Sequence, residues 1–206
     1  MANATKPVTD GVITTVPASE ASWDDLQAIF GKRGVAANCQ CQWFRYRTAQ
    51  FNAAPAVERA GWFREQTACG QPGAATSGLV AYLDGEPAGW CAVEPRPAYE
   101  RLLTSRVVWP GRNEDRADDG VWAVTCFVTR AGFRRRGVSA ALARSSVDHA
   151  RQRGARALEG YPMLTEPGEE VPWGALYIGS RGIFAAAGFA EVSHPTPRRA
   201  VMRIDF

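Results

Sequence analysis

The order of apolar and amphipathic segments predicts an α/β protein with one central mixed sheet flanked by helices. Residues 79–83 and 88–93 are apolar runs on either side of a short turn, and they predict a β-hairpin. Residues 121–128 form a β-branched apolar run. A helix-like segment over 137–153 separates this run from another strand at 155–161. A hairpin followed by alternating strands and helices is typical of an α/β sandwich.

The N-terminal third predicts helices. Ser22, followed by two acids in the first turn, predicts a helix over residues 23–30, and Gly31 predicts its end. Pro55 suits the first position of a second helix over residues 56–67.

The remaining segments supply connections and further strands. Residues 95–120 are polar and rich in proline, arginine and aspartate, which predicts a short helix and an exposed loop. A Pro- and Glu-rich loop over 162–174 leads to a helix around 180–187. Two C-terminal strands are expected at 189–193 and 200–205.

Length and composition fit a flexible tail over residues 1–12 and a single domain over 13–206. The net charge of +3 is too small to suggest a nucleic-acid binder. No run approaches the roughly 18 apolar residues that cross a bilayer. The start lacks the basic-then-apolar layout of a secretory signal, so we expect a cytoplasmic protein without membrane or nucleic-acid partners.

The cysteines predict reduced thiols and no metal. They are odd in number and scattered, apart from one Cys-x-Cys pair: Cys39, Cys41, Cys69, Cys91 and Cys126. A structural zinc site usually needs four ligands with paired spacings, and neither histidine forms a motif with the pair. A packed or substrate-facing loop is therefore the favoured interpretation of the Cys39–Cys41 segment.

The stretch from Val121 to Ser139 is the most informative part of the chain. An apolar strand is followed by a loop with three consecutive arginines, then by Gly137 and Ser139 at the start of a helix. The first N–H groups of a helix lack internal partners and, together with the helix dipole, attract anions. Gly137 would let a phosphate approach the main chain. A solvated basic turn is the alternative, but the strand–loop–helix context favours a phosphorylated ligand.

Two motifs resemble the GNAT superfamily of acetyl-CoA-dependent N-acyltransferases. The run Arg134-Arg135-Arg136-Gly137-Val138-Ser139 resembles the family's Arg/Gln-x-x-Gly-x-Gly/Ala pyrophosphate loop, with Ser139 in place of Gly or Ala. Residues 176–189, which end in Gly188-Phe189, resemble its helix ending in Gly-Phe. The resemblance implies a mostly antiparallel mixed sheet with splayed parallel central strands flanked by helices. It also implies acetyl-CoA as co-substrate, a helical acceptor-side region over 13–75, and a sheet and acetyl-CoA-binding core over 76–206.

The resemblance assigns the cofactor residues by position. Main-chain groups of Cys126, Phe127 and Val128 would hold the pantetheine arm, and Arg134, Arg135, Arg136, Gly137, Val138 and Ser139 the diphosphate. Gly179, Ser180 and Phe184 are expected to line the same site.

The catalytic residues depart from the family pattern. The strand before the loop carries no glutamate, and Phe184 stands where the family often has a tyrosine. We predict substitutes: Glu159 as base, Tyr177 near the thiol, and Glu94 as a further base. Each has a structural alternative, since Glu159 could pair with an arginine and Tyr177 could simply pack.

The leading hypothesis is an N-acetyltransferase that acts on a primary amine of an unidentified, small acceptor. Residues 38–51 mix aromatic, thiol and amide side chains without a clear period, and we expect a helix–loop element that covers part of an acceptor pocket. The aromatic side chains expected there are Trp43, Phe44, Tyr46, Phe51 and Trp90, with ordinary core packing as the alternative.

A catalytically silent domain that binds acyl-CoA as a sensor or scaffold is the main alternative, because the usual catalytic pair is missing. A phosphotransferase is disfavoured, because the chain has no Gly-x-x-x-x-Gly-Lys-Ser/Thr loop. The sequence leaves open whether the protein forms a homodimer.

Overall fold

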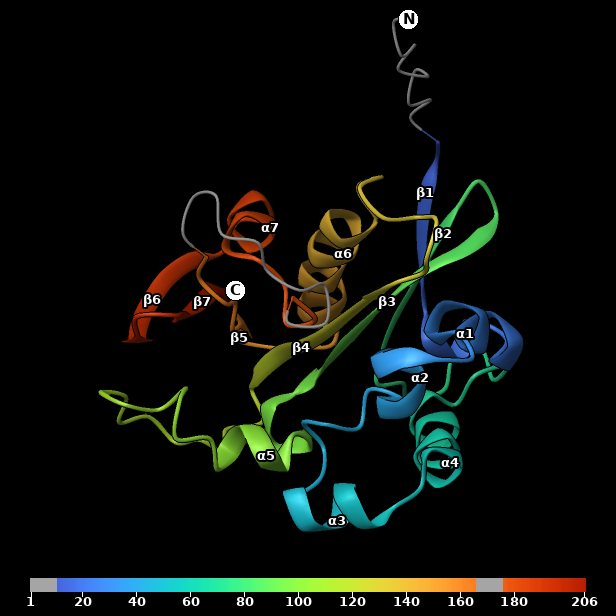
Figure 1. Ribbon diagram of the computed structural model, residues 1–206. Coiled ribbons are helices and arrows are strands. Elements are labelled where there is room, and N and C mark those ends of the chain that lie inside the picture. The colour runs from blue at the N-terminus through green and yellow to red at the C-terminus, as the bar shows by residue number, and fades with distance from the viewer. Residues whose placement is uncertain (1–10, 166–175) are drawn as a thin grey trace, which may run out of the picture.

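A sheet of seven strands, in the order β1-β2-β3-β4-β5-β7-β6, runs through the part of the chain that the computed structural model describes, residues 11–165 and 176–206 (Figure 1). The strands are β1 (Ile13–Pro17), β2 (Gly78–Leu83), β3 (Glu86–Pro95), β4 (Val121–Thr129), β5 (Ala157–Gly160), β6 (Ala190–Thr196) and β7 (Arg199–Asp205). Neighbouring strands are antiparallel except for the parallel pair β4–β5. The predicted α/β fold with a mostly antiparallel sheet and parallel central strands is confirmed.

Helices cover both faces of the sheet (Figure 1). One face carries α6 (Val138–Gln152) and α7 (Arg181–Ala186). The other face and its rim carry η1 (Ala18–Glu20), α1 (Trp23–Phe30), α2 (Gly34–Cys39), α3 (Thr48–Ala53), α4 (Ala56–Thr67), η2 (Arg96–Ala98) and α5 (Glu100–Leu103).

Local signals explain where the helices begin and end. The Ser22 side chain accepts from the Asp25 N–H, and the Asp25 carboxylate accepts from the Ser22 N–H. This capping box starts α1 as predicted, and Gly31 ends the helix with φ +73°. Pro55 is the N-cap of α4 rather than its first helical residue, a shift of one position.

Strand β1 was not predicted from the sequence. Its residues, Ile13–Pro17, pair antiparallel with β2 at the edge of the sheet. An edge strand that is mostly half-buried shows no clean alternation of apolar and polar residues, so the pattern gave no signal. Most of the tail predicted over 1–12 and of the loop predicted over 162–174 lies outside the described residues.

The two parallel strands separate after a short pairing. β5 pairs with β4 only from Val121 to Val124, whereas β4 continues to Thr129 with β3 alone on its other side. The β3–β4 register shifts between Ala92 and Val93, which leaves Thr125 as an extra residue in a bulge. The second half of β4 therefore presents a free edge toward the place that β5 has left.

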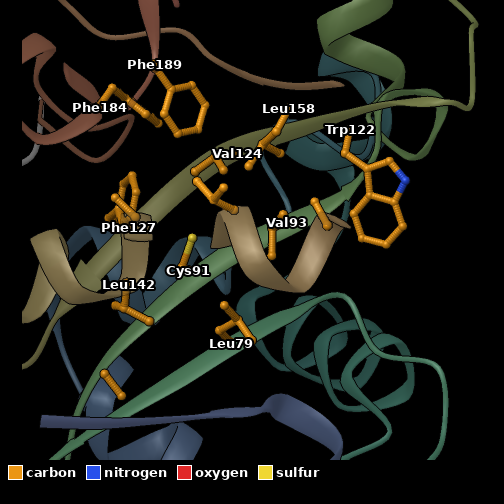
Figure 2. Packing of buried hydrophobic residues seen from close by; sticks show 14 of the residues in the cluster. Leu79, Cys91, Val93, Trp122, Val124, Phe127, Leu142, Leu158, Phe184 and Phe189 are labelled. Atoms are coloured by element: carbon orange, nitrogen blue, oxygen red, sulfur yellow. The ribbon is translucent and has the colours of Figure 1, made fainter. Parts of the chain in front are cut away.

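The core on the α6 face holds the start of that helix against the sheet. Figure 2 shows Leu142 and Phe184 among apolar side chains of β2, β3 and β4. A β-carbon on Gly89 would lie 2.5 Å from a methyl group of Val138. Helix α6 thus packs directly on β3 at this glycine, and its first turn is held close to the end of β4.

The segment after β3 is more buried than the predicted exposed loop. Tyr99, Leu102, Val108 and Trp109 form an apolar cluster with residues of β4 and β7, and the Trp109 indole N–H donates to the Leu102 carbonyl at 2.8 Å. Among the described residues, no helix is both long enough and apolar enough to cross a membrane.

Candidate functional site

A cavity of about 970 Å³ lies beside the free edge of β4. Its wall is formed by the end of β4, the loop and first turn of α6, residues 176–183 around Tyr177, and the region from α1 to α4. Every charged side chain among the described residues that line it is an arginine: Arg33, Arg59, Arg130 and Arg134. The cavity therefore favours a ligand that carries negative charge.

One main-chain group of β4 faces the gap between the strands. The Phe127 N–H donates to the Tyr177 carbonyl at 2.5 Å, not to β3. Since main-chain groups alternate between the two sides of a strand, those of Cys126 and Val128 are directed at β3. Of the three residues predicted to hold a pantetheine arm, Phe127 offers its N–H on this edge, and all three line the cavity.

The start of α6 has the features of an anion site. Gly137 is its N-cap with φ +80°, and no side chain in the described ranges caps the first N–H groups. Ser139 and Arg134 line the cavity, and the Ser139 hydroxyl lies 3.0 Å from that of Thr129. The helix start, a hydroxyl and a guanidinium therefore lie on one wall.

The other members of the motif lie off the cavity wall. Arg136 is 3.8 Å from the Asp84 carboxylate, Arg135 is exposed with φ +59°, and Val138 is buried beneath the helix. These side chains shape and charge the surroundings, and the motif reaches the cavity through Arg134 and Ser139.

Two of the residues predicted near the second motif belong to the core. Phe184 is fully buried, and β-carbons on Gly160 or Gly179 would lie 2.3 Å and 2.8 Å from its ring. Only Ser180 lines the cavity, and its hydroxyl accepts from the Ile183 N–H to start α7. The two glycines are needed because the Phe184 ring fills the space that their side chains would occupy.

Tyr177 is the one predicted catalytic residue that lines the cavity. Its ring centroid lies 6.2 Å from that of Phe44. Burial, with a smaller effect of Cys126, raises the pKa of the Tyr177 phenol, so the group is protonated at neutral pH. A protonated hydroxyl at this wall can donate a proton.

Glu94 lies at the end of β3, outside the lining residues, and its carboxylate is paired with Arg45. Burial raises the pKa of Glu94, and the Arg45 guanidinium opposes that effect. A carboxyl with a raised pKa suits a base that works near neutral pH.

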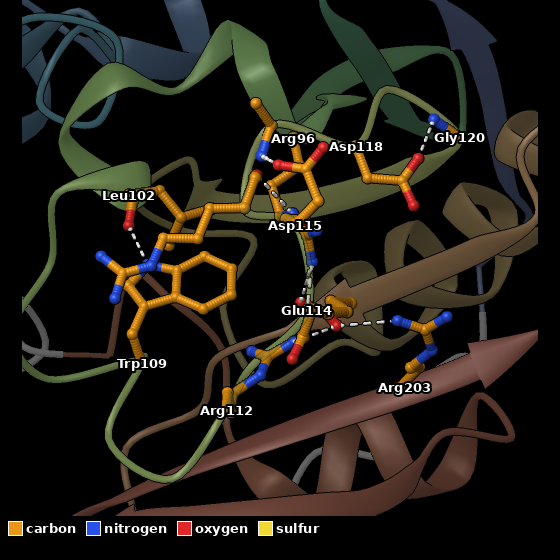
Figure 3. Close-up of polar contacts among 12 residues, drawn as sticks. Arg96, Leu102, Trp109, Arg112, Glu114, Asp115, Asp118, Gly120 and Arg203 are labelled. Carbon is orange, nitrogen blue, oxygen red and sulfur yellow. Dashed lines mark hydrogen bonds and ion pairs between the residues drawn. The ribbon is translucent and has the colours of Figure 1, made fainter.

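Glu159 lies outside the cavity, in a cluster of arginines. Its carboxylate, which has no solvent exposure, is 2.5 Å from Arg112, 3.1 Å from Arg203 and 3.3 Å from Arg96. Figure 3 shows these guanidiniums converging from the 96–112 segment and from β7. The Tyr161 hydroxyl donates to the same carboxylate at 2.8 Å. With both oxygens engaged, the residue has the geometry of a structural anchor.

The Cys-x-Cys pair faces the cavity without a metal-binding arrangement. Cys39 and Cys41 both line it, and the Trp90 indole N–H donates to the Cys41 sulfur at 3.2 Å. No cluster of three or more potential metal ligands occurs in the described ranges. Burial raises the pKa of Cys39, and a hydrogen bond with Cys41 together with burial raises that of Cys126, which keeps these thiols protonated and unreactive.

Of the predicted aromatic side chains, Trp43 and Phe51 line the cavity. Trp90 is fully buried in the core, and the Tyr46 ring packs at a tilt against Trp62, with ring centroids 4.3 Å apart. Arg33, Arg59 and Arg130 also line the cavity and were not predicted as site residues. No local motif marks them, because their neighbours at the wall come from other segments of the chain.

Comparison with known proteins agrees with this geometry. The family model described as "Acetyltransferase (GNAT) family" matches residues 40–161. No curated protein matches the sequence in a direct comparison.

Solved structures have the same fold at low sequence identity. The Salmonella typhimurium protein yncA, solved with its cofactor acetyl-CoA, is 14% identical with a TM-score of 0.52, covering 94% of this chain and 93% of that one. An N-acetyltransferase from Staphylococcus aureus Mu50 is 14% identical with a TM-score of 0.53, covering 94% and 98%. Ribosomal-protein-alanine N-acetyltransferase from Brucella melitensis is 15% identical with a TM-score of 0.50, covering 95% and 99%.

Proposed function

Because the chain belongs to the acetyltransferase (GNAT) family, we propose that it transfers the acetyl group of acetyl-CoA to a primary amine of a small acceptor. The observation that carries this proposal is the cavity itself. Around one space it brings together a strand edge that β5 has left, a helix start without a side-chain cap among the described residues, and charged side chains that are all arginines.

The residues present fit acetyl-CoA. The N–H of Phe127 is satisfied by a loop carbonyl instead of a strand, so a ligand amide or carbonyl could take that position. Elsewhere on the cavity wall, the first turn of α6 with Arg134 and Ser139 suits a diphosphate. Acetyl-CoA would supply the thioester carbonyl that the amine attacks.

The protein's own groups have three tasks in this reaction. The Phe127 N–H positions the pantetheine arm beside β4 when a ligand carbonyl replaces the Tyr177 carbonyl as its acceptor. Tyr177, protonated at neutral pH, donates a proton to the departing thiolate. Of the two predicted bases we keep Glu94, whose pKa burial raises; because it is paired with Arg45 outside the cavity lining, it would take the amine's proton through water. Glu159 holds the 96–112 segment to β5 and β7 through its arginines.

Release of free thiol from acetyl-CoA across a panel of primary amines tests the proposal. Calorimetry with acetyl-CoA alone, run in parallel, measures binding. Binding accompanied by amine-dependent thiol release supports the transferase. Binding without release by any amine favours the silent acyl-CoA sensor, and no binding at all contradicts both functions.

A further inference from the structure

The charges around the cavity are one-sided. Arg130 and Arg134 lie near the start of α6, on the wall that suits the diphosphate, whereas Arg33 and Arg59 lie on the wall formed by α1 to α4. No aspartate or glutamate is found among the described lining residues. Glu94 lies outside the lining and is neutralised by its partner, Arg45. The α1–α4 wall therefore carries positive charge of its own, apart from the charge on the wall that suits the diphosphate.

Arg59 is held rigidly with one side of its guanidinium unused. Its Nε donates to the Asn38 carbonyl at 2.8 Å, and its Nη1 donates to the carbonyls of Phe51 and Ala54, both at 2.9 Å. The guanidinium carbon also lies 4.4 Å from the centre of the Phe51 ring. The Nη2 group makes no hydrogen bond with the described residues, and the side chain lines the cavity. With Nε and Nη1 engaged, Nη2 can donate a charge-assisted hydrogen bond to one oxygen of a ligand carboxylate.

Arg33 supplies a second positive charge on the same wall. It lies in the turn between α1 and α2, is exposed, and has no side-chain partner in the described ranges. Its charge is therefore not neutralised by a neighbouring carboxylate, and it is available to a ligand.

The aromatic side chains beside these arginines give the wall an apolar surface. Trp43 and Phe51 both line the cavity and contact edge-to-face, with ring centroids 5.2 Å apart. Arg101 stacks on the Trp43 ring at 3.6 Å and donates to its carbonyl at 2.5 Å, which fixes the indole. A ligand at this wall thus meets flat apolar surface next to guanidiniums.

We infer that the acceptor is an amino acid with an apolar side chain, whose carboxylate binds Arg59 and Arg33 and whose side chain packs on Trp43 and Phe51. The inference rests on the proposed function, since it names the substrate class of the same site. Cationic acceptors such as polyamines are disfavoured, because every charged lining side chain that the structure describes would repel them.

Matched pairs of amines test the substrate class. We expect kcat/KM from thiol release to be about 10- to 100-fold higher for L-phenylalanine than for L-phenylalaninamide, because the amide loses charge-assisted hydrogen bonds to guanidinium. The amide's amine is the less basic of the two, so more of it is unprotonated and the chemistry alone favours the amide. A preference for the acid therefore reports recognition of the carboxylate.

Substitutions in the α1–α4 wall show which residues cause the preference for the acid over the amide. Arg59→Gln and Arg33→Gln should each raise KM for L-phenylalanine and reduce the acid-to-amide ratio, with KM for acetyl-CoA unchanged. Arg64→Gln is the matched control, because Arg64 is an exposed arginine of the same helix outside the cavity lining. Arg33→Gln breaks no hydrogen bond of the described residues, so it tests the charge even if Arg59→Gln loosens the loop that it anchors.

The outcomes separate the inference from the proposed function. Equal kcat/KM for acid and amide, or faster release with spermidine than with L-phenylalanine, overturns the inference and leaves the transferase in place. An acid preference that survives both substitutions also overturns it. Acetyl-CoA binding without thiol release by any amine contradicts the proposed function and the inference together.

Discussion

The main-chain N–H of Phe127 donates a hydrogen bond to the carbonyl oxygen of Tyr177, with an N···O distance of 2.5 Å. This contact attaches residue 177 to the free edge of β4, where β5 no longer pairs. Its phenol is thereby held on the cavity wall near Cys126 and Phe44. Phe127 and Tyr177 both line the cavity, and the contact between them uses only main-chain atoms. A substitution of the Tyr177 side chain therefore tests its hydroxyl without changing this contact.

Tyr177→Phe should lower turnover by about 100-fold, in the range of a lost general acid, with little change in acetyl-CoA affinity. The substitution removes the hydroxyl and keeps the main-chain contact with Phe127. Steady-state thiol release and calorimetry measure the two quantities. Tyr46→Phe is the control, because Tyr46 packs against Trp62 and does not line the cavity. Near-parental turnover of the Tyr177 variant would exclude the hydroxyl as proton donor.

Gly137→Val should abolish or strongly weaken acetyl-CoA binding in a folded protein. A β-carbon at Gly137 would meet only Ile13, at 3.6 Å, so steric overlap with the protein is not the cause. The cause is φ +80°, a conformation that valine avoids, which would displace the first N–H groups of α6. Gly132→Val introduces the same kind of strain at φ +89° in the same loop, but away from the helix start. Calorimetry showing equal affinities for both variants and the parent would count against an anion site here.

Glu159→Gln should destabilise the protein by about 3–5 kcal/mol, because it leaves the charges of Arg96 and its neighbours without a buried counter-ion. Urea unfolding measures the free energy. The comparison is Glu191→Gln, whose partners Arg181 and His194 are largely exposed, and which should cost no more than about 1 kcal/mol. A Glu159 variant of parental stability that loses only turnover would restore this residue as the catalytic base.

His149 should make stability depend on pH. Burial, with a smaller effect of Arg153, lowers its pKa from 6.5 to about 4, so the folded protein binds fewer protons than the unfolded chain between these values. Stability should therefore fall as pH drops, by roughly 2 kcal/mol between pH 7 and pH 5. Urea unfolding of the parent and of His149→Gln at both pH values isolates the contribution. An equal pH dependence in both proteins would contradict it.

Much of the fold follows from local signals in the sequence. The capping residues of α1, the β2–β3 hairpin and the passage from β4 into α6 depend on neighbouring residues, so their patterns predict them. The anion site at the start of α6 was predicted for the same reason, because strand, glycine and helix start are contiguous in the chain. Strand β1 was missed because its only partner, β2, lies about 65 residues away and its edge position leaves no alternation.

The tertiary structure alone decided which charged groups meet. Glu159 and Tyr177 are equally conspicuous in the sequence, yet three arginines from distant segments surround the first, while the second reaches the cavity. Arg33 and Arg59 carry no motif at all and reach the same cavity only because α1, α2 and α4 pack over the same face. A side chain's chemistry depends on its solvation and its partners, and both are set by contacts between segments that the linear pattern does not record.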